Sequence, residues 1–186
     1  ESKVGNLLSN YALTKKVNEE YARLFYKLYD FKSIGLRYFN VFGKRQDPNG
    51  AYAAVIPKWV ASVLNNEDVF INGDGETSRD FCYVENAVQM NILAALNKKN
   101  NGCEIFNVAS NKKITLNDLY DIIWKNIENI SNTNISYRRP NYKNFRDGDI
   151  MHSRADIKKA ILQLGYDPMV NLNQGISDTV KWFYQN

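Results

Sequence analysis

Apolar and polar positions along the chain alternate between the spacing of helices and that of strands. In residues 11–29, apolar side chains recur every three or four positions, which predicts a long helix. Residues 33–42 are almost continuously apolar or aromatic, the pattern of a buried strand. A second helix is predicted over residues 55–64, followed by a short strand at residues 69–71. Helices that alternate with buried strands are typical of α/β proteins with parallel pairing.

The second half of the chain continues this alternation. The elements predicted there are a strand and then a helix within 81–98, a strand at 105–108, a helix at 116–127, an edge strand at 135–137, and helices at 156–164 and 173–184. Thr115 is expected to cap the 116–127 helix, because its side-chain oxygen accepts a hydrogen bond from a free amide of the first turn. Gly165 is expected as a C-cap, where glycine adopts the left-handed conformation without strain.

Composition narrows the class of protein. The chain has 186 residues, of which 44% are hydrophobic and 24% charged, an ordinary globular balance. No apolar run reaches the length of about 20 residues that a membrane helix needs, and no secretory signal is recognised, so a cytoplasmic protein is expected. The net charge of +4 is spread along the chain, and Arg138-Arg139 is too short a basic run for nucleic-acid binding. Cys82 and Cys103 fit no metal-binding spacing and are expected to be free thiols.

Tyr11 and Lys15 form the first candidate for chemistry. Residues four apart on a helix lie on one face, so the phenol and the ammonium are neighbours. A nearby ammonium favours the ionised form of a phenol. Such a phenol is a general base that takes a proton from an alcohol while hydride leaves the same carbon. On its own, however, the Tyr-x-x-x-Lys spacing is also common as an ordinary pair on a helix surface.

Four segments, in order, resemble the extended short-chain dehydrogenase/reductase family. Residues 9–19 resemble its active-site helix, and residues 36–43 resemble the strand and loop that follow this helix. Residues 73–84 resemble the segment with one diphosphate-binding arginine, and residues 146–150 resemble the R-x-G-D element with a second. Within this family the likeness is greatest to UDP-N-acetylglucosamine 4-epimerases, through residues 45–59.

The resemblance implies an α/β fold made of two parts. One is the C-terminal part of an NAD-binding, Rossmann-type doubly wound sheet, and the other is a smaller α/β substrate-binding domain. Residues 1–45 would end the Rossmann-type domain, and residues 46–186 would form mainly the substrate-binding domain, with residues 80–110 returning to the first. No glycine-rich G-x-G-x-x-G turn occurs in the sequence. That turn, and the Ser or Thr that bonds the sugar 4-hydroxyl, are expected upstream, so the chain alone is expected to be an inactive fragment of a homodimeric enzyme.

The resemblance also assigns site residues in the whole enzyme. Tyr11 would be the catalytic base, with Lys15 as its electrostatic partner and ligand of the nicotinamide ribose. Arginine suits a diphosphate better than lysine, because its planar guanidinium donates several hydrogen bonds at once. The positions expected to contact NAD are Tyr11, Lys15, Tyr38 and Phe39. Those expected to contact the UDP-sugar are Asn40, Gln46, Ala54, Val55, Trp59, Phe70, Ile71, Asn72, Arg79, Arg146 and Ser153.

The implied reaction is reversible inversion at C4 of a UDP-hexose, in nucleotide-sugar and surface-polysaccharide biosynthesis. NAD would be regenerated in each turnover. Ser153 lies at the position expected to border the C2 substituent, where a small side chain leaves room for an N-acetyl group, although a serine there can also cap the helix expected from residue 156. Two alternatives stay open. One is a nucleotide-sugar 4,6-dehydratase or decarboxylase of the same family, and the other is a nucleotide-sugar binding domain without catalysis.

Overall fold

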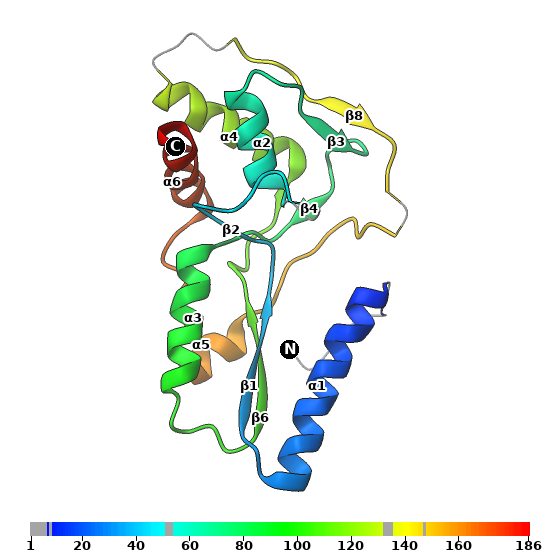
Figure 1. Ribbon diagram of the computed structural model, residues 1–186, viewed down its shortest axis with the longest axis vertical. Helices are drawn as coiled ribbons and strands as arrows, with labels where there is room; N and C mark the ends of the chain where they lie inside the picture. Colours follow the sequence, from blue (N-terminus) through cyan, green and yellow to red (C-terminus); the bar gives the residue numbers. More distant parts are fainter. Residues whose placement is uncertain (1–6, 8, 51–53, 132–135, 147) are drawn as a thin grey trace.

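Helices and mainly parallel strands alternate along the chain, which confirms the predicted α/β class. The computed structural model describes residues 7, 9–50, 54–131, 136–146 and 148–186. The elements form two parts stacked along the long axis of the molecule. β1 and β6 run through one part, and α2, α4 and α6 gather in the other (Figure 1).

The first part is built on one long helix and one parallel pair of strands. Helix α1, Asn10–Tyr29, begins after Ser9, whose hydroxyl accepts a hydrogen bond from the Ala12 amide at 3.1 Å. Strand β1, Ser33–Tyr38, pairs in parallel with β6, Cys103–Val108, along its whole length. The chain reverses between α1 and β1, so the N-terminal end of the helix lies towards the carboxyl end of the strand (Figure 1). The predicted first helix and the 105–108 strand are confirmed.

The strand predicted over residues 33–42 is wrong in its middle, because it is two strands and not one. Asn40 has a φ of 39°, in the left-handed region that interrupts a strand. Its side-chain amide donates a hydrogen bond to the backbone carbonyl of Asp80 at 2.8 Å, which holds this bend in place. Beyond the bend, β2, Val41–Phe42, pairs in parallel with β5, Cys82–Tyr83. The bend therefore carries the chain from the first part of the fold into the second.

Three helices enclose the core of the second part. These are α2, Val55–Leu64, α4, Leu116–Ile130, and α6, Leu172–Gln185. Thr115 caps α4 as predicted, accepting a hydrogen bond from the Asp118 amide at 3.1 Å. The side chains that meet between the helices are apolar and almost fully buried, and include Ile56, Trp59, Val60, Leu119, Ile123 and Ile176.

Two short pairs of strands complete this part. β3, Phe70–Asn72, pairs in parallel with β8, Asn141–Lys143. β4, Ser78–Arg79, pairs antiparallel with β7, Ile114–Thr115. The β4–β7 pair was not predicted, because two residues per strand are too few to show a periodicity.

The edge strand predicted at residues 135–137 is a further correction. Residue 135 lies outside the described residues, and Tyr137 is not in a strand. The Tyr137 ring packs instead against Trp124 of α4, with ring centres 5.2 Å apart, and its hydroxyl donates to Asp121. Tyr137 therefore packs against a helix instead of joining a strand. The strand of this segment, β8, begins a few residues later.

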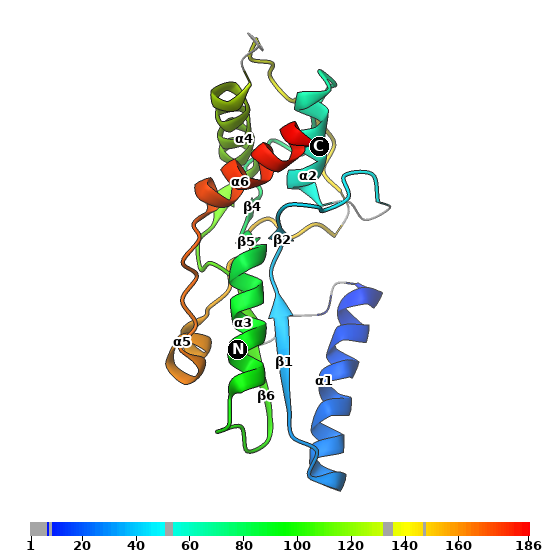
Figure 2. The same ribbon diagram turned by 60° about the vertical axis from the view of Figure 1, so that its left-hand side comes forward.

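A second apolar cluster fills the first part. Helices α3, Val84–Leu96, and α1 lie on opposite sides of β1 (Figure 2). Helix α5, Lys158–Leu164, ends at Gly165, whose φ of 68° confirms the predicted C-cap. The buried members of this cluster include Met90, Phe106, Val108, Ala155 and Tyr166. Two clusters agree with two domains, but the boundaries given above stay predictions.

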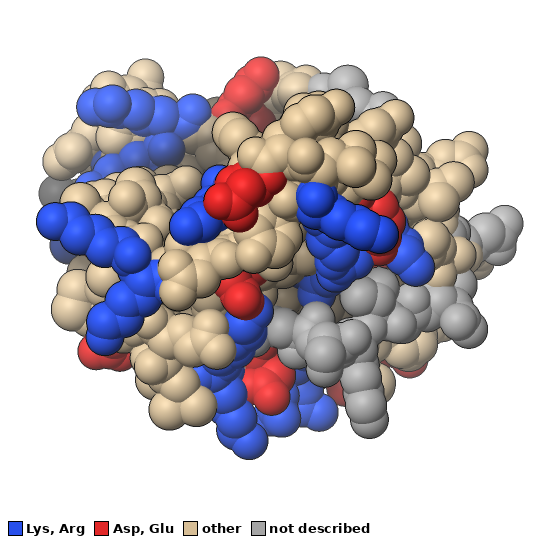
Figure 3. Space-filling model, turned by 90° about the horizontal axis from the view of Figure 1, so that it is seen from below, with Lys and Arg blue, Asp and Glu red and all other residues tan. Residues whose placement is uncertain are grey.

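One face of the surface agrees with a spread charge (Figure 3). Seen from below, lysine and arginine side chains are interspersed with acidic ones (Figure 3). Within the described part of the chain, no helix combines the length and the apolar character that crossing a membrane requires. Cys82 and Cys103 are both free.

Candidate active site

A cavity of about 400 Å³ lies between α2, β3 and the segment that contains Arg146. Of the residues predicted to contact the UDP-sugar, all except Gln46 and Ser153 line it. They come from positions between 40 and 146, so the fold gathers residues that are far apart in the sequence. The predicted residues that line this cavity are Asn40, Ala54, Val55, Trp59, Phe70, Ile71, Asn72, Arg79 and Arg146.

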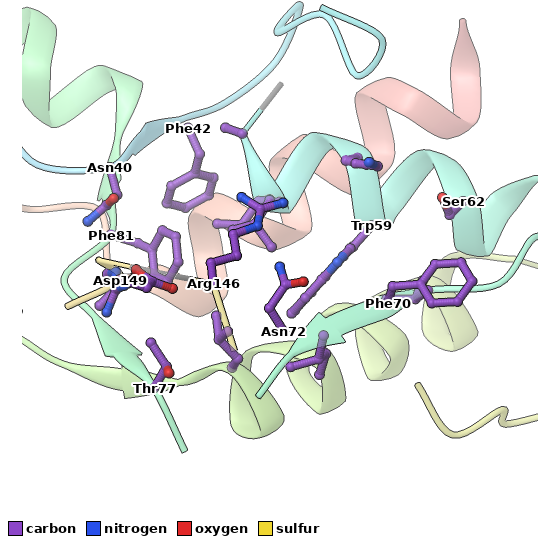
Figure 4. Close-up of a pocket in the computed structure, with 18 of the residues that line it drawn as sticks. Asn40, Phe42, Trp59, Ser62, Phe70, Asn72, Thr77, Phe81, Arg146 and Asp149 are labelled. Atoms are coloured by element: carbon purple, nitrogen blue, oxygen red, sulfur yellow. Dashed lines mark hydrogen bonds and ion pairs between the residues drawn. The ribbon is translucent and has the colours of Figure 1, made fainter. Parts of the chain in front are cut away.

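The walls of this cavity combine aromatic rings with a few polar groups. In Figure 4, Arg146 lies between the rings of Phe42 and Phe81 on one side and the side chains of Trp59 and Asn72 on the other. Trp59 is held rigidly, because its ring packs edge-on against Tyr120 of α4 at 5.9 Å between centres. Apolar walls with a few placed polar groups are typical of sites for small organic ligands.

Arg79 is held in one orientation at the edge of the cavity. Its Nη2 forms an ion pair with Asp149 Oδ1 at 2.5 Å. Its Nη1 donates to the backbone carbonyls of Ser78, at 2.9 Å, and Met151, at 3.4 Å. A guanidinium carries five N–H donors, so others remain for a phosphate group. The resemblance named Arg79 and Arg146 but not Asp149, although Asp149 is the aspartate of the R-x-G-D element; residue 147 of that element lies outside the described residues.

A second cavity, of about 320 Å³, adjoins the first. It is lined by Tyr38 and Ser153, and it shares Asn40, Arg79 and Asp149 with the first cavity. Phe39 and Ile150 also line it. The two cavities are therefore neighbours across these three shared side chains, and an elongated ligand with an anionic centre can occupy both.

Ser153 does not cap a helix, so that alternative for its role is wrong. Helix α5 begins at Lys158, and its N-cap is Ile157. Ser153 instead donates its backbone amide to the Ser78 carbonyl at 3.0 Å, which places it beside the second cavity.

Asp80 is a buried carboxylate for which the sequence predicted no role. Its Oδ1 accepts hydrogen bonds from the Ser110 amide and hydroxyl, at 3.0 and 2.7 Å, and its Oδ2 accepts one from the Ala155 amide at 3.2 Å. The side-chain amide of Asn40 also donates to the backbone carbonyl of Asp80. Asp80 therefore connects three segments next to Arg79. An aspartate between Arg79 and the apolar Phe81 was the available signal, since an unpaired carboxylate is rarely buried.

Tyr11 and Lys15 lie apart from these cavities. They share one face at the start of α1 as predicted, with Lys15 Nζ 5.0 Å from the centre of the Tyr11 ring. The Tyr11 side chain is 70% exposed, and neither residue lines either cavity. Gln46 also lies outside both, and its Nε2 donates to the Val41 carbonyl at 3.4 Å. Most of the residues predicted to contact the UDP-sugar thus line the two cavities, whereas Tyr11, Lys15 and Gln46 do not.

Comparison with known proteins settles the family. The model of the NAD dependent epimerase/dehydratase family matches residues 1–109. This chain belongs to that family. A Methanocaldococcus jannaschii protein named as a UDP-glucose 4-epimerase is 40% identical over 181 residues, which are 97% of this chain and 55% of that protein. The chain therefore spans about half the length of the curated relatives it matches.

Two solved structures share the fold of this epimerase/dehydratase chain. A UDP-N-acetylglucosamine 4-epimerase from Methanobrevibacter ruminantium M1, in complex with UDP-N-acetylmuramic acid, has a TM-score of 0.88 and 40% identity. The match covers 100% of this chain and 56% of that one. A UDP-glucose 4-epimerase from Thermotoga maritima, with UDP-glucose, has a TM-score of 0.84 and 34% identity, over 100% of this chain and 60% of that one.

The family uses NAD, and the described residues of this epimerase/dehydratase chain fit one end of it. Ligands of open α/β sheets bind at the carboxyl ends of the strands, which is where Tyr38 ends β1 and Phe39 follows it. Phe39 donates its amide to the Val108 carbonyl at 3.0 Å, so a cofactor contact from Phe39 falls to its ring or its carbonyl. Tyr11 and Lys15 supply a phenol and an ammonium of the kind that binds a ribose. The sequence has no G-x-G-x-x-G turn for the pyrophosphate, so the fit is confined to the nicotinamide end.

Proposed function

We propose that the protein containing this chain interconverts UDP-N-acetylglucosamine and UDP-N-acetylgalactosamine by inverting C4 of the sugar. One observation carries the proposal. Arg79 and Arg146 line a cavity with aromatic walls, and Arg79 also lines a second cavity that is bordered by the small side chain of Ser153. The identity of 40% to a UDP-N-acetylglucosamine 4-epimerase over the full length of this chain supports it.

The two cavities suggest how the substrate is bound. The nucleoside lies in the larger cavity against Trp59 and Phe70, where burial of the base against aromatic rings is favourable. The diphosphate lies between Arg79 and Arg146, because an anion is stabilised most by charge-assisted hydrogen bonds. The sugar then extends into the smaller cavity, towards Tyr38 and Ser153.

Tyr11 and Lys15 carry the proton transfer in this proposal. Hydride acceptance from C4 of the sugar, and its return, is the chemistry that NAD would supply when bound. Tyr11 takes the proton of the 4-hydroxyl, and the ammonium of Lys15, 5.0 Å from the Tyr11 ring, stabilises the phenolate. The arginines hold the diphosphate while the 4-keto sugar turns about it. The arginine cavity therefore provides binding, and the start of α1 provides the base.

The test is turnover of UDP-N-acetylglucosamine by the whole protein, followed by chromatography of the UDP-sugars. Tyr11→Phe keeps the ring but removes the proton acceptor, so kcat should fall by at least about 100-fold. Tyr21→Phe, which alters another exposed tyrosine of α1, is the matched control and should keep full activity. If no UDP-hexose is epimerised, or if Tyr11→Phe turns over normally, the proposal fails.

The products of the reaction distinguish an epimerase from the alternative enzymes of the same family. A 4,6-dehydratase releases water from the sugar and a decarboxylase releases carbon dioxide, whereas an epimerase leaves the mass unchanged. Mass spectrometry of the UDP-sugar after turnover therefore decides between them. The homodimer and the cytoplasmic location stay predictions.

One observation favours binding without catalysis for the chain by itself. Both cavities are lined by residues of this chain, while Tyr11 is exposed and lies outside them. We therefore propose that residues 1–186 alone bind UDP but neither bind NAD tightly nor catalyse epimerisation. Calorimetry with UDP and with NAD tests this, and tight NAD binding would contradict it.

A further inference from the structure

Glu19, midway along α1, is joined to Arg37 of β1 by a two-pronged ion pair. Arg37 Nε donates to Glu19 Oε1 at 2.6 Å, and Arg37 Nη2 donates to Glu19 Oε2 at 2.8 Å. Both side chains are partly buried, with 19% of Glu19 and 24% of Arg37 exposed. Two parallel hydrogen bonds between a planar guanidinium and a carboxylate fix orientation as well as distance. This pair therefore sets the angle at which α1 lies on β1.

The pair lies on the helix face that carries the proposed base. Tyr11, Lys15 and Glu19 follow one another at intervals of four residues, and side chains at this spacing share one face of a helix. Arg37, in turn, directly precedes Tyr38, which lines the second cavity. The ion pair thus connects the face with the phenol and the ammonium to the strand end at the proposed sugar site.

Few hydrogen bonds join α1 to the rest of the fold among the described residues. The helix has no buried side chain. Besides the pair with Arg37, the Tyr26 hydroxyl donates to the Asn101 carbonyl at 2.8 Å, which ties the described part of α1 to the loop before β6. Both contacts lie at or beyond the middle of the helix. The position of Tyr11, in the first turns, therefore depends on the rigidity of the helix between it and these contacts.

The distance along α1 from the ion pair to Tyr11 makes the position of Tyr11 sensitive to the angle of the helix. At a rise of 1.5 Å per residue, Tyr11 lies about 12 Å along the axis from Glu19. A tilt of about 5° around the ion pair therefore moves the phenol by about 1 Å. A displacement of that size in a reacting group lowers a rate by about 100-fold.

We propose that Glu19 and Arg37 form a positioning pair, which places the base Tyr11 relative to the strand end at Tyr38. The inference rests on the proposed function, because it takes Tyr11 as the base. The hydrogen bonds from Arg37 also lower the pKa of Glu19, so the carboxylate keeps its charge at neutral pH. The pair touches neither the substrate cavities nor the Tyr11 ring, and it acts through the helix.

The experiment compares two adjacent glutamates in the whole protein. Glu19→Gln removes the pair with β1. Glu20→Gln is the matched control, because Glu20 pairs with Arg23 on the same helix, at 2.5 Å, and both of these side chains are about half exposed. Arg37→Gln removes the other partner, and Arg37→Lys keeps the charge but loses the two-pronged geometry. The double variant with Gln at both positions completes a mutant cycle.

The expected result is a loss in kcat without a loss in binding. Glu19→Gln and Arg37→Gln should each lower kcat by about 10- to 100-fold, with KM for the UDP-sugar within about twofold, because the proposed substrate contacts lie elsewhere. The double variant should be no slower than the worse single variant, since each single change already breaks the pair. Glu20→Gln should behave like the wild type.

A second readout does not depend on turnover. Amide hydrogen exchange in α1 should be faster in Glu19→Gln than in Glu20→Gln, because the helix loses an attachment to β1. Where Tyr11→Phe is inactive, equal kcat in these two variants would overturn the positioning role, and equal exchange would show that the pair does not attach α1 to β1. A loss in Arg37→Lys close to that in Arg37→Gln supports the geometric requirement, and full activity in Arg37→Lys would show that charge alone suffices. Should Arg37→Gln not fold, the Glu19 and Arg37→Lys variants still decide.

The two proposals fail separately. If the wild-type protein epimerises no UDP-hexose, or if Tyr11→Phe is fully active, the proposed function fails. The exchange of α1 in the two glutamate variants then decides whether the pair positions the helix. If Tyr11→Phe is inactive while Glu19→Gln matches Glu20→Gln in kcat, the positioning pair is wrong and the proposed function stands.

Discussion

Arg79 and Asp149, which are 70 residues apart in the sequence, form an ion pair of 2.5 Å at the boundary of the two cavities. Asp149 follows Arg146 by three residues, and Arg79 and Arg146 both line the larger cavity. The Arg79 guanidinium is also fixed by the backbone carbonyls of Ser78 and Met151. A donor that is already held in place loses little side-chain entropy when it binds an anion.

The first prediction concerns these two arginines. Arg79→Ala and Arg146→Ala should each weaken UDP binding by about 1.5–3 kcal/mol, the scale of a hydrogen bond to a charged group. Calorimetry with UDP on the whole protein measures the change. Arg139→Ala, which removes an exposed arginine that does not line either cavity, should leave the affinity unchanged. Equal affinity in all three variants would mean that the diphosphate binds elsewhere.

The second prediction concerns the sugar. Ser153→Tyr should lower kcat/KM for UDP-N-acetylglucosamine much more than for UDP-glucose, because the ring fills the space that an N-acetyl group needs. Crowding of this kind changes selectivity by about 1–3 kcal/mol. Because Ser153 does not cap α5, the melting temperature should change little. Equal losses on both sugars would leave the N-acetyl preference supported by family likeness alone.

Much of this architecture could be predicted from the sequence where a periodic signal is long. The helix α1 and the cap at Thr115 were predicted because each depends on local chemistry. The bend at Asn40 could not be predicted, since its left-handed conformation is stabilised by a hydrogen bond to the carbonyl of Asp80, forty residues later. The same holds for Tyr137, which packs against α4 instead of forming a strand.

In the candidate site, too, some features could be predicted from the sequence and others depend on contacts between distant residues. Family likeness named Arg79 and Arg146, but it could not show that Asp149 holds Arg79 in place. Nor could it show the pair of Glu19 with Arg37, because its partners lie on different elements. Such contacts depend on tertiary packing, for which a single sequence carries no periodic signal.

The third prediction tests the packing beneath α6. A methyl group on Gly175 would lie 2.8 Å from the Tyr83 ring and 3.0 Å from Phe42, and both rings are 1% exposed. Alanine normally favours a helix over glycine by about 1 kcal/mol. The overlap should outweigh this gain, so Gly175→Ala should lower the free energy of unfolding by about 1–2 kcal/mol.

Urea unfolding of Gly175→Ala and of a matched variant measures this. At Gly35 of β1, an added methyl would meet Ile105 at 3.5 Å, an ordinary contact. Gly35→Ala should therefore be neutral or slightly stabilising. A Gly175→Ala variant as stable as Gly35→Ala would show that the two rings yield without strain.

The fourth prediction concerns two buried tyrosines that differ in their hydrogen bonds. The Tyr166 hydroxyl donates to the Ala109 carbonyl at 2.9 Å. The Tyr83 hydroxyl is buried and has no hydrogen-bond partner among the residues that the structure describes. At neutral pH, Tyr166→Phe should lower the free energy of unfolding by about 1–2 kcal/mol, because it leaves a buried carbonyl without its donor. Tyr83→Phe should be neutral or stabilising, since no such bond is lost.

The pH dependence of the free energy of unfolding above pH 10 gives a second test of the Tyr83 hydroxyl. Burial raises the pKa of Tyr83 to about 12, above the value of about 10 in an unfolded chain. A raised pKa in the folded state means that the neutral phenol contributes its full stability below about pH 10, and that this contribution is lost as pH rises towards 12. Tyr83→Phe removes this titration, so its free energy of unfolding should decline less than that of the wild type between pH 10 and 12. Urea unfolding at several pH values in this range checks the difference, and parallel declines in the two proteins would show that the Tyr83 phenol is not held neutral by burial.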